Sequence, residues 1–270
     1  MKISISNIAS VYQSHSEFYE LLKKEGIDYV DVAPTKLFSG WDYTESQVRQ
    51  ARLLLDDFGL KAMGMQSLLY GLPELNVFGN PKSKYLQLRA HFERLCALAC
   101  ALGVTHLVLG SPKGRDISGC TMQQAIDFAC ERFNDLAELC GQNGLTLCIE
   151  PVATRLGGNF LVSTQETVDF VRDIGHPNLK INLDTAVLFE DGTKPYETVY
   201  ESYDAIGHVH ISEPDLNSFE CPQCDHDEVS NALRECGYTG TLAIEMLTEP
   251  LSAAKSICEA ACYAKSLYGK

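Results

Sequence analysis

The sequence contains no long uninterrupted apolar segment. A membrane-spanning helix needs about 18 or more predominantly apolar residues in a row, and no stretch of these 270 residues approaches that length. The first ten residues, MKISISNIAS, also lack the basic and then apolar arrangement of a secretory signal. We therefore expect a cytoplasmic protein that has no membrane partner.

Positive charge is scarce. The chain has 22 lysine and arginine residues against 36 aspartate and glutamate residues, a net charge of −14 at pH 7. No cluster of basic residues offsets this excess locally. Because such a surface repels phosphate backbones, we expect no nucleic-acid partner.

Three common nucleotide and hydrolase motifs are also missing. The segment after the first apolar run reads SNIASVYQS, which contains no G-x-G-x-x-G dinucleotide fingerprint. There is no P-loop and no G-x-S-x-G nucleophile elbow. The sequence therefore contains none of the motifs that usually indicate phosphoryl transfer or serine hydrolysis.

Cysteine is present in an odd number, 11, and much of it lies in apolar helical patterns, for example at Cys96, Cys100, Cys130 and Cys140. This usage indicates a reducing compartment and small buried side chains rather than a disulfide framework. The segment from Cys221 to Cys224, CPQC, has the spacing of half a zinc knuckle. A matching second pair is absent, so we interpret these two as ordinary loop cysteines.

Short runs rich in valine, isoleucine and leucine alternate with longer helical patterns. Such alternation is typical of βαβ units and a parallel sheet. The runs begin about 34 residues apart on average, the length that a strand, a helix and two loops require. They begin near Ile3, Ile27, Lys61, His106, Leu145, Leu179, Ile206 and Thr241.

Helix boundaries are marked between these runs. Capping-box patterns precede four of the helical segments, and Asn80–Pro81 marks the start of another. The box pairs are Ser14 with Glu17, Thr44 with Gln47, Thr121 with Gln124, and Ser163 with Glu166. With no linker or composition shift, the pattern predicts an α/β protein with one domain over residues 1–270, a single (β/α)8 TIM barrel. An open doubly wound sheet is the alternative.

Ligand-type side chains end the last four predicted strands, at Glu150, Asp184, His210 and Glu245. In a barrel, the carboxyl ends of the strands carry the reacting groups. Carboxylate and imidazole groups without thiolate suit Mn²⁺, Mg²⁺, Co²⁺ or Zn²⁺. Any one of them could be a charged residue where the chain re-enters solvent. Four in succession predict a site for one divalent metal ion, since carboxylates buried together are costly without a cation.

Other polar residues near strand ends are candidates for substrate binding. Gln66 ends the third run, and Lys113 and Arg115 follow the fourth, where they could hold a hydroxyl-rich or anionic substrate; a solvated basic loop is the alternative. Glu213 in HISEP could support the site or contact the substrate, or it could be a solvated loop residue.

His208 shares the inward face of its strand with His210, and we interpret it as a hydrogen-bonded core histidine.

The segments around the four ligand-type residues carry a family resemblance. They read IEP at Glu150, HPNLKINLDT leading to Asp184, GHVHISE around His210, and GYTGTLAIEM ending at Glu245. In this order they resemble the xylose isomerase-like barrel superfamily, and within it the sugar epimerases of the tagatose/psicose type, over essentially the whole chain. The resemblance implies a carbohydrate isomerase or epimerase with a sugar substrate and a metal, Mn²⁺ first, in which Glu150 and Glu245 also act as the acid/base pair. Homo-oligomers are common in that family.

Two departures from the family pattern concern the substrate. The epimerases carry a histidine where this chain has Val187, and an arginine where it has Leu216. An inosose-type dehydratase, which also begins by removing a proton next to a carbonyl, and a sugar-binding barrel without turnover are therefore alternatives. The apurinic endonucleases of the same superfamily are excluded by the net charge and by the small number of histidines, 7.

Overall fold

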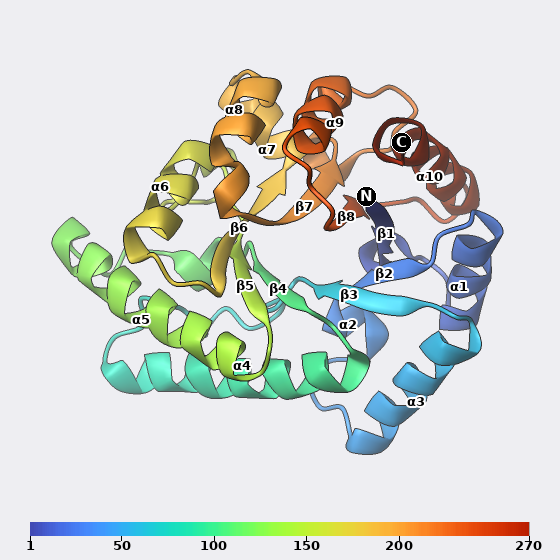
Figure 1. Ribbon diagram of the computed structural model, residues 1–270. Coiled ribbons are helices and arrows are strands. Elements are labelled where there is room, and N and C mark those ends of the chain that lie inside the picture. Colours follow the sequence, from blue (N-terminus) through green and yellow to red (C-terminus); the bar gives the residue numbers. More distant parts are fainter. Residues whose placement is uncertain (270) are drawn as a thin grey trace.

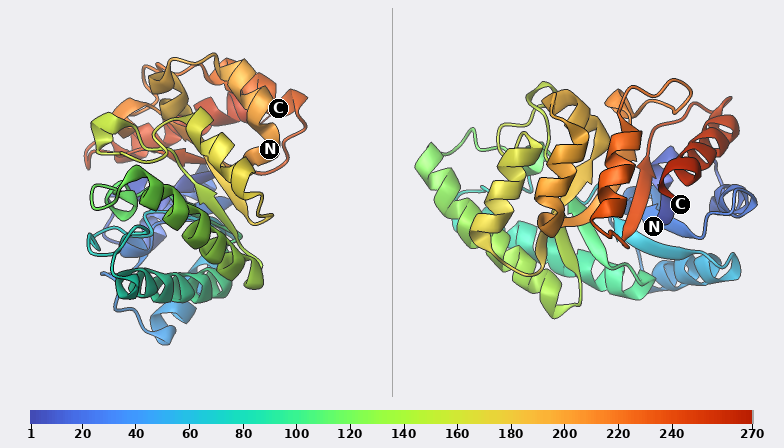
Figure 2. Two further views of the ribbon diagram at one scale, coloured as in Figure 1. Left: turned by 90° about the vertical axis from the view of Figure 1, so that its left-hand side faces the viewer. Right: turned by 45° about the horizontal axis from the view of Figure 1, so that its top comes forward.

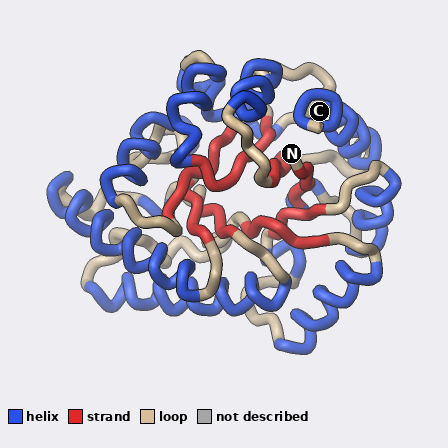
Figure 3. The backbone as a smooth tube through the Cα atoms, in the orientation of Figure 1, coloured by secondary structure: helices blue, strands red, loops and turns tan. Residues whose placement is uncertain are grey.

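The computed structural model describes residues 1–269, which form a closed barrel of eight parallel strands. Figures 1 and 3 show the strands as a ring in the middle of the molecule with the helices around it. The strands are β1 (Lys2–Ser6), β2 (Tyr29–Val32), β3 (Lys61–Met65), β4 (His106–Leu109), β5 (Thr146–Ile149), β6 (Leu179–Asp184), β7 (Ile206–Ser212) and β8 (Thr241–Glu245). β1 pairs with β8 and closes the barrel. The predicted fold is thus confirmed, and each predicted run contains a strand.

The helices form the outer layer, as the two views in Figure 2 show from other sides. They are α1 (His15–Lys24), α2 (Pro34–Leu37), α3 (Glu45–Asp57), α4 (Lys82–Leu102), α5 (Met122–Gln142), α6 (Thr164–Ile174), α7 (Thr185–Asp191), α8 (Pro195–Ser202), α9 (His226–Glu235) and α10 (Ala253–Tyr268). Within residues 1–269, none of these helices has the length and apolar character needed to cross a membrane.

Helix caps follow the sequence signals in part. Thr44 and Thr121 each form a complete capping box with the glutamine three residues later. Ser163 caps α6, but the side chain of Glu166 accepts from the amides of residues 161 and 162 instead. Ser14 accepts from the amide of residue 16, so α1 begins with a simple cap rather than the predicted box. Pro81 is the cap of α4 rather than its first residue.

The cysteine prediction was only partly right. Cys96 and Cys140 are buried between α4 and α5, but Cys100 and Cys130, in the same two helices, are exposed. The reason is that these helices bury one face against the barrel and present the other to solvent. All eleven cysteines are free thiols.

Strand register places the ends of the last strands at one level. Asp184 of β6 pairs with His210 of β7, and Ser212 of β7 pairs with Glu245 of β8. Successive side chains of a strand alternate between the barrel interior and the helix layer. Residues at matching register therefore point into the same mouth, and the fold gathers these side chains without help from a long loop.

Candidate active site

Four side chains meet at the carboxyl end of the barrel. Asp184 ends β6, His210 lies in β7, Glu245 ends β8, and Glu150 directly follows β5. Nδ1 of His210 lies 3.0 Å from Oε2 of Glu150, 3.0 Å from Oε2 of Glu245 and 3.9 Å from Oδ2 of Asp184. One ligand atom from each residue lies within 4.8 Å of the others. The structure thus brings together all four residues that the sequence predicted as metal ligands.

Neighbouring polar groups hold the carboxylates in place. The amide nitrogen of Asn182 donates to Oε2 of Glu150 at 2.7 Å, and the hydroxyl of Ser212 donates to Oδ1 of Asp184 at 2.7 Å. The side-chain amide of Gln66 donates to Oε1 of Glu245. These bonds leave Oε1 of Glu150 without a hydrogen-bond donor among residues 1–269, while Oε2 of Glu245 faces Nδ1 of His210. Preorganised carboxylates of this kind can bind a cation or accept a proton with little rearrangement.

A glycine makes room for Glu150. Gly110 follows β4, and a Cβ atom built there would lie 2.4 Å from Oε1 of Glu150 and 3.1 Å from its carboxyl carbon. Any other residue at this position would compete with the carboxylate for the same space. Gly110 is therefore part of the site although it carries no functional group.

The close packing of these groups shifts the pKa values of Asp184, His210 and Glu245. Burial, followed by the charges of Glu150 and Glu245, raises the pKa of Asp184 to about 7. Burial alone would lower the pKa of His210, but Glu245 and Glu150 outweigh it and raise that pKa well above its ordinary value. For Glu245, burial alone would raise the pKa, but His210 and Gln66 hold it below its ordinary value. Asp184 and His210 thus retain protons that a cation would displace.

Two adjoining cavities open at the mouth, and Gly110, Pro112, Glu150 and Glu245 line both. The first has a volume of about 210 Å³ and is also lined by Gln66 and Tyr70. His210 lines the first cavity, whereas Asp184 lines the second, of about 420 Å³, together with Val187, Leu216 and Arg155. The two departures from the epimerase pattern therefore lie on the wall of the second cavity.

The other predicted substrate-binding residues lie in different places. Gln66 lines the first cavity, as a substrate contact would. Lys113 is exposed and lines neither of the two cavities, so its position fits the alternative of a solvated basic loop. Arg115 is almost fully buried, and its Nη2 donates to the main-chain oxygen of Glu150 at 2.6 Å. It therefore supports the backbone beneath Glu150 instead of reaching into either cavity.

Glu213 is also buried, although it lines the second cavity. Its carboxylate lies 2.8 Å from Nε2 of His226 and accepts from the amides of Gln223 and Cys224. These contacts tie the end of β7 to the start of α9. Both oxygens are thus committed to the fold around the CPQC segment.

Sequence reasoning missed Arg155. It lies in a short 3₁₀ helix after β5 and forms ion pairs with Glu190 and with Asp215, the latter at 2.7 Å. All three line the second cavity. A signal existed, since Arg155 follows Glu150 in a loop at the carboxyl end of a strand, where barrel enzymes place substrate contacts.

The comparisons with known proteins agree with this architecture. D-psicose 3-epimerase from Agrobacterium fabrum is 29% identical over 126 residues, 46% of this chain and 43% of the relative. The match thus spans less than half the length of this curated relative. A D-psicose 3-epimerase crystallised in the presence of D-fructose superposes with a TM-score of 0.85 at 20% identity, covering 100% of both chains. D-psicose 3-epimerase from Clostridium cellulolyticum H10, crystallised with D-tagatose, superposes with a TM-score of 0.84 at 17% identity, covering 99% of each chain.

At these sequence identities, the similarity to the two solved structures supports the fold only. The comparison with a family model also identifies the family. A model of the family described as xylose isomerase-like TIM barrel matches residues 19–265, nearly the whole chain. Together with the closed eight-stranded barrel, this match shows that the chain belongs to the xylose isomerase-like TIM barrel family.

Proposed function

We propose that this protein is a divalent-metal-dependent sugar epimerase that inverts a carbon next to a carbonyl group. The observation that carries the proposal is the convergence of Glu150, Asp184, His210 and Glu245 at the barrel mouth. Relatives named D-psicose 3-epimerase and ketose 3-epimerase support the choice of a ketose as substrate class. The sugars present with two superposable structures, D-fructose and D-tagatose, belong to the same class.

The donor set fits a divalent cation. Neither nitrogen of His210 has an aligned hydrogen-bond partner within the described part of the chain, although two glutamate oxygens lie 3.0 Å away. Three carboxylates and one imidazole are hard and borderline ligands, which suit Mn²⁺ first and also Mg²⁺, Co²⁺ or Zn²⁺. When bound, such a cation would polarise the carbonyl group of the sugar and acidify the neighbouring C–H bond.

The two glutamates are the proposed acid/base pair. They come from β5 and β8, three strands apart on the barrel wall, so they approach a sugar in the mouth from different sides. Oε1 of Glu150, which faces Gly110, is free to take or return a proton. Glu245 performs the opposite transfer, with Gln66 holding its carboxylate in orientation. Removal on one side and return on the other inverts the carbon.

The function is tested by hydrogen exchange. The Mn²⁺-loaded protein is incubated in D₂O with a panel of ketoses, aldoses and inososes, and products are followed by NMR. We expect deuterium at the carbon next to the carbonyl together with the epimeric sugar. Loss of water with a new ultraviolet chromophore would instead identify a dehydratase. Binding without any exchange would identify a sugar-binding barrel and contradict the proposal.

The second cavity predicts where substrate selectivity lies. Val187 and Leu216 offer no hydrogen bonds to sugar hydroxyls, whereas Arg155 places a guanidinium on the same wall. We expect Arg155→Ala to raise KM for the true substrate by about tenfold, the effect of losing one charge-assisted hydrogen bond, with kcat changed much less. Steady-state kinetics measure both parameters.

Arg172→Ala is the matched control for that variant. Arg172 is similarly exposed and ion-paired, with Asp204, but it lies in α6 away from both cavities. Its kinetics should equal those of the unmodified protein. Equal KM values for Arg155→Ala and Arg172→Ala would remove Arg155 from the substrate site.

Cation affinity should increase with pH. In the metal-free site, the raised pKa values of Asp184 and His210 mean that both groups still hold protons near neutrality. A cation must displace these protons, so its Kd should fall about tenfold or more for each unit of pH rise through the range of roughly 6 to 8. Calorimetry of Mn²⁺ binding in buffers with different ionisation enthalpies measures the affinity and the protons released. A Kd that stays constant over this range, without proton release, would place Mn²⁺ elsewhere.

A further inference from the structure

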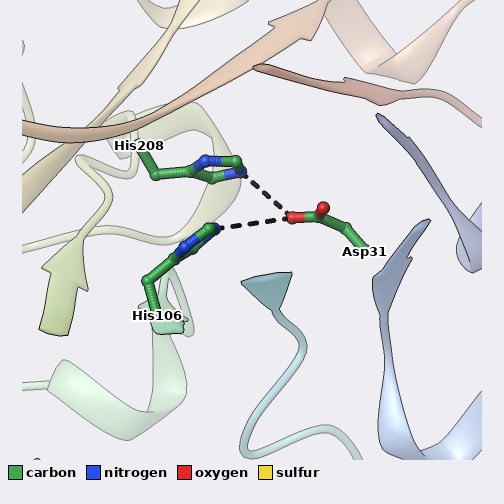
Figure 4. Close-up of side chains that lie close together, drawn as sticks. All are labelled: Asp31, His106 and His208. Carbon is green, nitrogen blue, oxygen red and sulfur yellow. Dashed lines mark ion pairs between the residues drawn. The ribbon is translucent and has the colours of Figure 1, made fainter. Parts of the chain in front are cut away.

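A second group of ligand-type side chains lies inside the barrel, apart from the four residues at the mouth. Figure 4 shows Asp31 of β2, His106 of β4 and His208 of β7 pointing toward one another. Oδ2 of Asp31 lies 3.0 Å from Nε2 of His208 and 3.8 Å from Nε2 of His106. The Asp31 and His208 side chains are fully buried, and that of His106 is 8% exposed.

These facing atoms are close to one another but poorly aligned for hydrogen bonds. Oδ2 of Asp31 and Nε2 of both histidines have no aligned partner among the residues that the structure describes. His208 was predicted to be a hydrogen-bonded core histidine, and it is buried, but both of its ring nitrogens are in this unpartnered set. Buried polar atoms without partners are rare and costly. Several of them around one point suggest a binding site for a cation.

Hydrogen bonding orients the ring of His106. The hydroxyl of Thr105 lies 3.2 Å from the main-chain oxygen of Met63 and 3.1 Å from Nδ1 of His106, so it holds the ring with Nε2 toward Asp31. In the tautomer that carries its proton on Nδ1, the Nε2 atom of His106 presents a lone pair on the side of the Asp31 carboxylate, as a metal-binding imidazole does. A cation between Nε2 and the carboxylate would favour this tautomer and bind both groups.

The surroundings are shaped for such a cation. Ser4 donates to the other oxygen of Asp31 at 2.7 Å, which leaves Oδ2 directed at the histidines. Zn²⁺ bonds of about 2.0 to 2.2 Å in tetrahedral geometry place donor atoms about 3.3 to 3.5 Å apart, and the two measured separations lie on either side of this value. Gly64 of β3 keeps the space open, since a Cβ there would lie 2.0 Å from Oδ2 of Asp31 and 2.5 Å from Nε2 of His106.

We propose that Asp31, His106 and His208 form a second divalent metal site, of the Zn²⁺ or Co²⁺ class, inside the barrel. It is independent of the mouth site and of the proposed function. It has one carboxylate and two imidazoles, and so fewer carboxylates than the site at the barrel mouth. It therefore favours cations that bind well to imidazole nitrogen. A cation there would join β2, β4 and β7 across the barrel interior.

A third group shows what a satisfied cluster looks like. Glu213, Cys224 and His226 are also close enough to hold a metal. The carboxylate of Glu213, however, accepts from the amides of Gln223 and Cys224 and contacts Nε2 of His226, and Nδ1 of His226 contacts the hydroxyl of Tyr268. That group is complete without a cation, and the contrast supports reading the Asp31 group as incomplete.

The test counts bound metal in four forms of the full chain by equilibrium dialysis against Zn²⁺. The unmodified protein should bind about two equivalents, and Asp184→Asn, which disables the mouth, about one. Adding His106→Gln to Asp184→Asn should remove that remaining equivalent. His176→Gln, which changes a histidine outside the barrel interior that contacts Glu138, should bind as the unmodified protein does.

A spectrum of the Asp184→Asn protein loaded with Co²⁺ provides a second measurement that does not depend on altering the buried group. Intense visible bands of tetrahedral Co²⁺ with nitrogen ligands support the site. The proposal is overturned if the Asp184→Asn protein binds no Zn²⁺ and gives no such bands, or if adding His106→Gln leaves its bound metal unchanged. One equivalent that is lost with His106→Gln but kept with Asp184→Asn would instead refute the mouth site and leave this one standing.

Discussion

Glu245→Gln should lower the rate of epimerisation by on the order of a hundredfold or more while leaving sugar binding nearly intact. The substitution keeps the size of the side chain and an oxygen that can face a cation, but it removes the ability to accept a proton. Gln66, which now donates to Oε1 of Glu245, can still bond the amide oxygen. The loss should therefore appear in kcat rather than in KM.

Exchange experiments with the two single epimers sharpen this prediction. If Glu150 and Glu245 serve opposite faces, the Glu245→Gln protein should still exchange the proton of one epimer with D₂O through Glu150, without producing the other epimer. Glu150→Gln should show the reverse preference. Glu249→Gln, an exposed residue four positions after Glu245, is the matched control and should retain full activity. Unchanged epimerisation by Glu245→Gln would exclude a two-glutamate mechanism.

The mouth group could be predicted from sequence because its geometry depends on simple rules. A strand that ends in a carboxylate presents it at the carboxyl rim, and consecutive strands are neighbours in a barrel. Asp184 and His210 therefore pair in register as the order of the runs implies. The resemblance to sugar epimerases depended on these same positions.

The interior group could not be predicted in this way. It joins β2, β4 and β7, which are not neighbours, so its formation depends on the tilt and stagger of the whole barrel. The pairing of β2 with β3 is also irregular between Val30 and Val32, the segment that contains Asp31. No local pattern reveals such a register shift.

Arg115 shows a different limit. A basic residue after a strand suggested a substrate contact, but its guanidinium turns inward and bonds the backbone of Glu150. Whether a long side chain points toward solvent, substrate or core depends on the packing around the loop. The sequence identifies the loop correctly, and the structure decides the direction.

Gly110→Ala should abolish most of the activity while the protein remains folded. The new methyl group would lie 2.4 Å from Oε1 of Glu150, well inside van der Waals contact. The atom that it meets is the end of a flexible side chain, so the carboxylate can move away at little cost to the fold. Displacing a catalytic group by about 1 Å can cost on the order of a hundredfold in rate. We therefore expect a loss of that size in kcat.

Gly119→Ala separates this effect from a general cost of replacing glycine. A Cβ at Gly119 meets no atom within 4 Å, and this glycine lies in an exposed part of the same connection between β4 and α5. Its kcat and its Tm should match those of the unmodified protein. Gly110→Ala should match it in Tm but not in kcat, because only the position of the Glu150 carboxylate differs. An active Gly110→Ala protein would show that Oε1 of Glu150 need not occupy the place where the structure puts it, and the proposed transfer of a proton by that atom would fail.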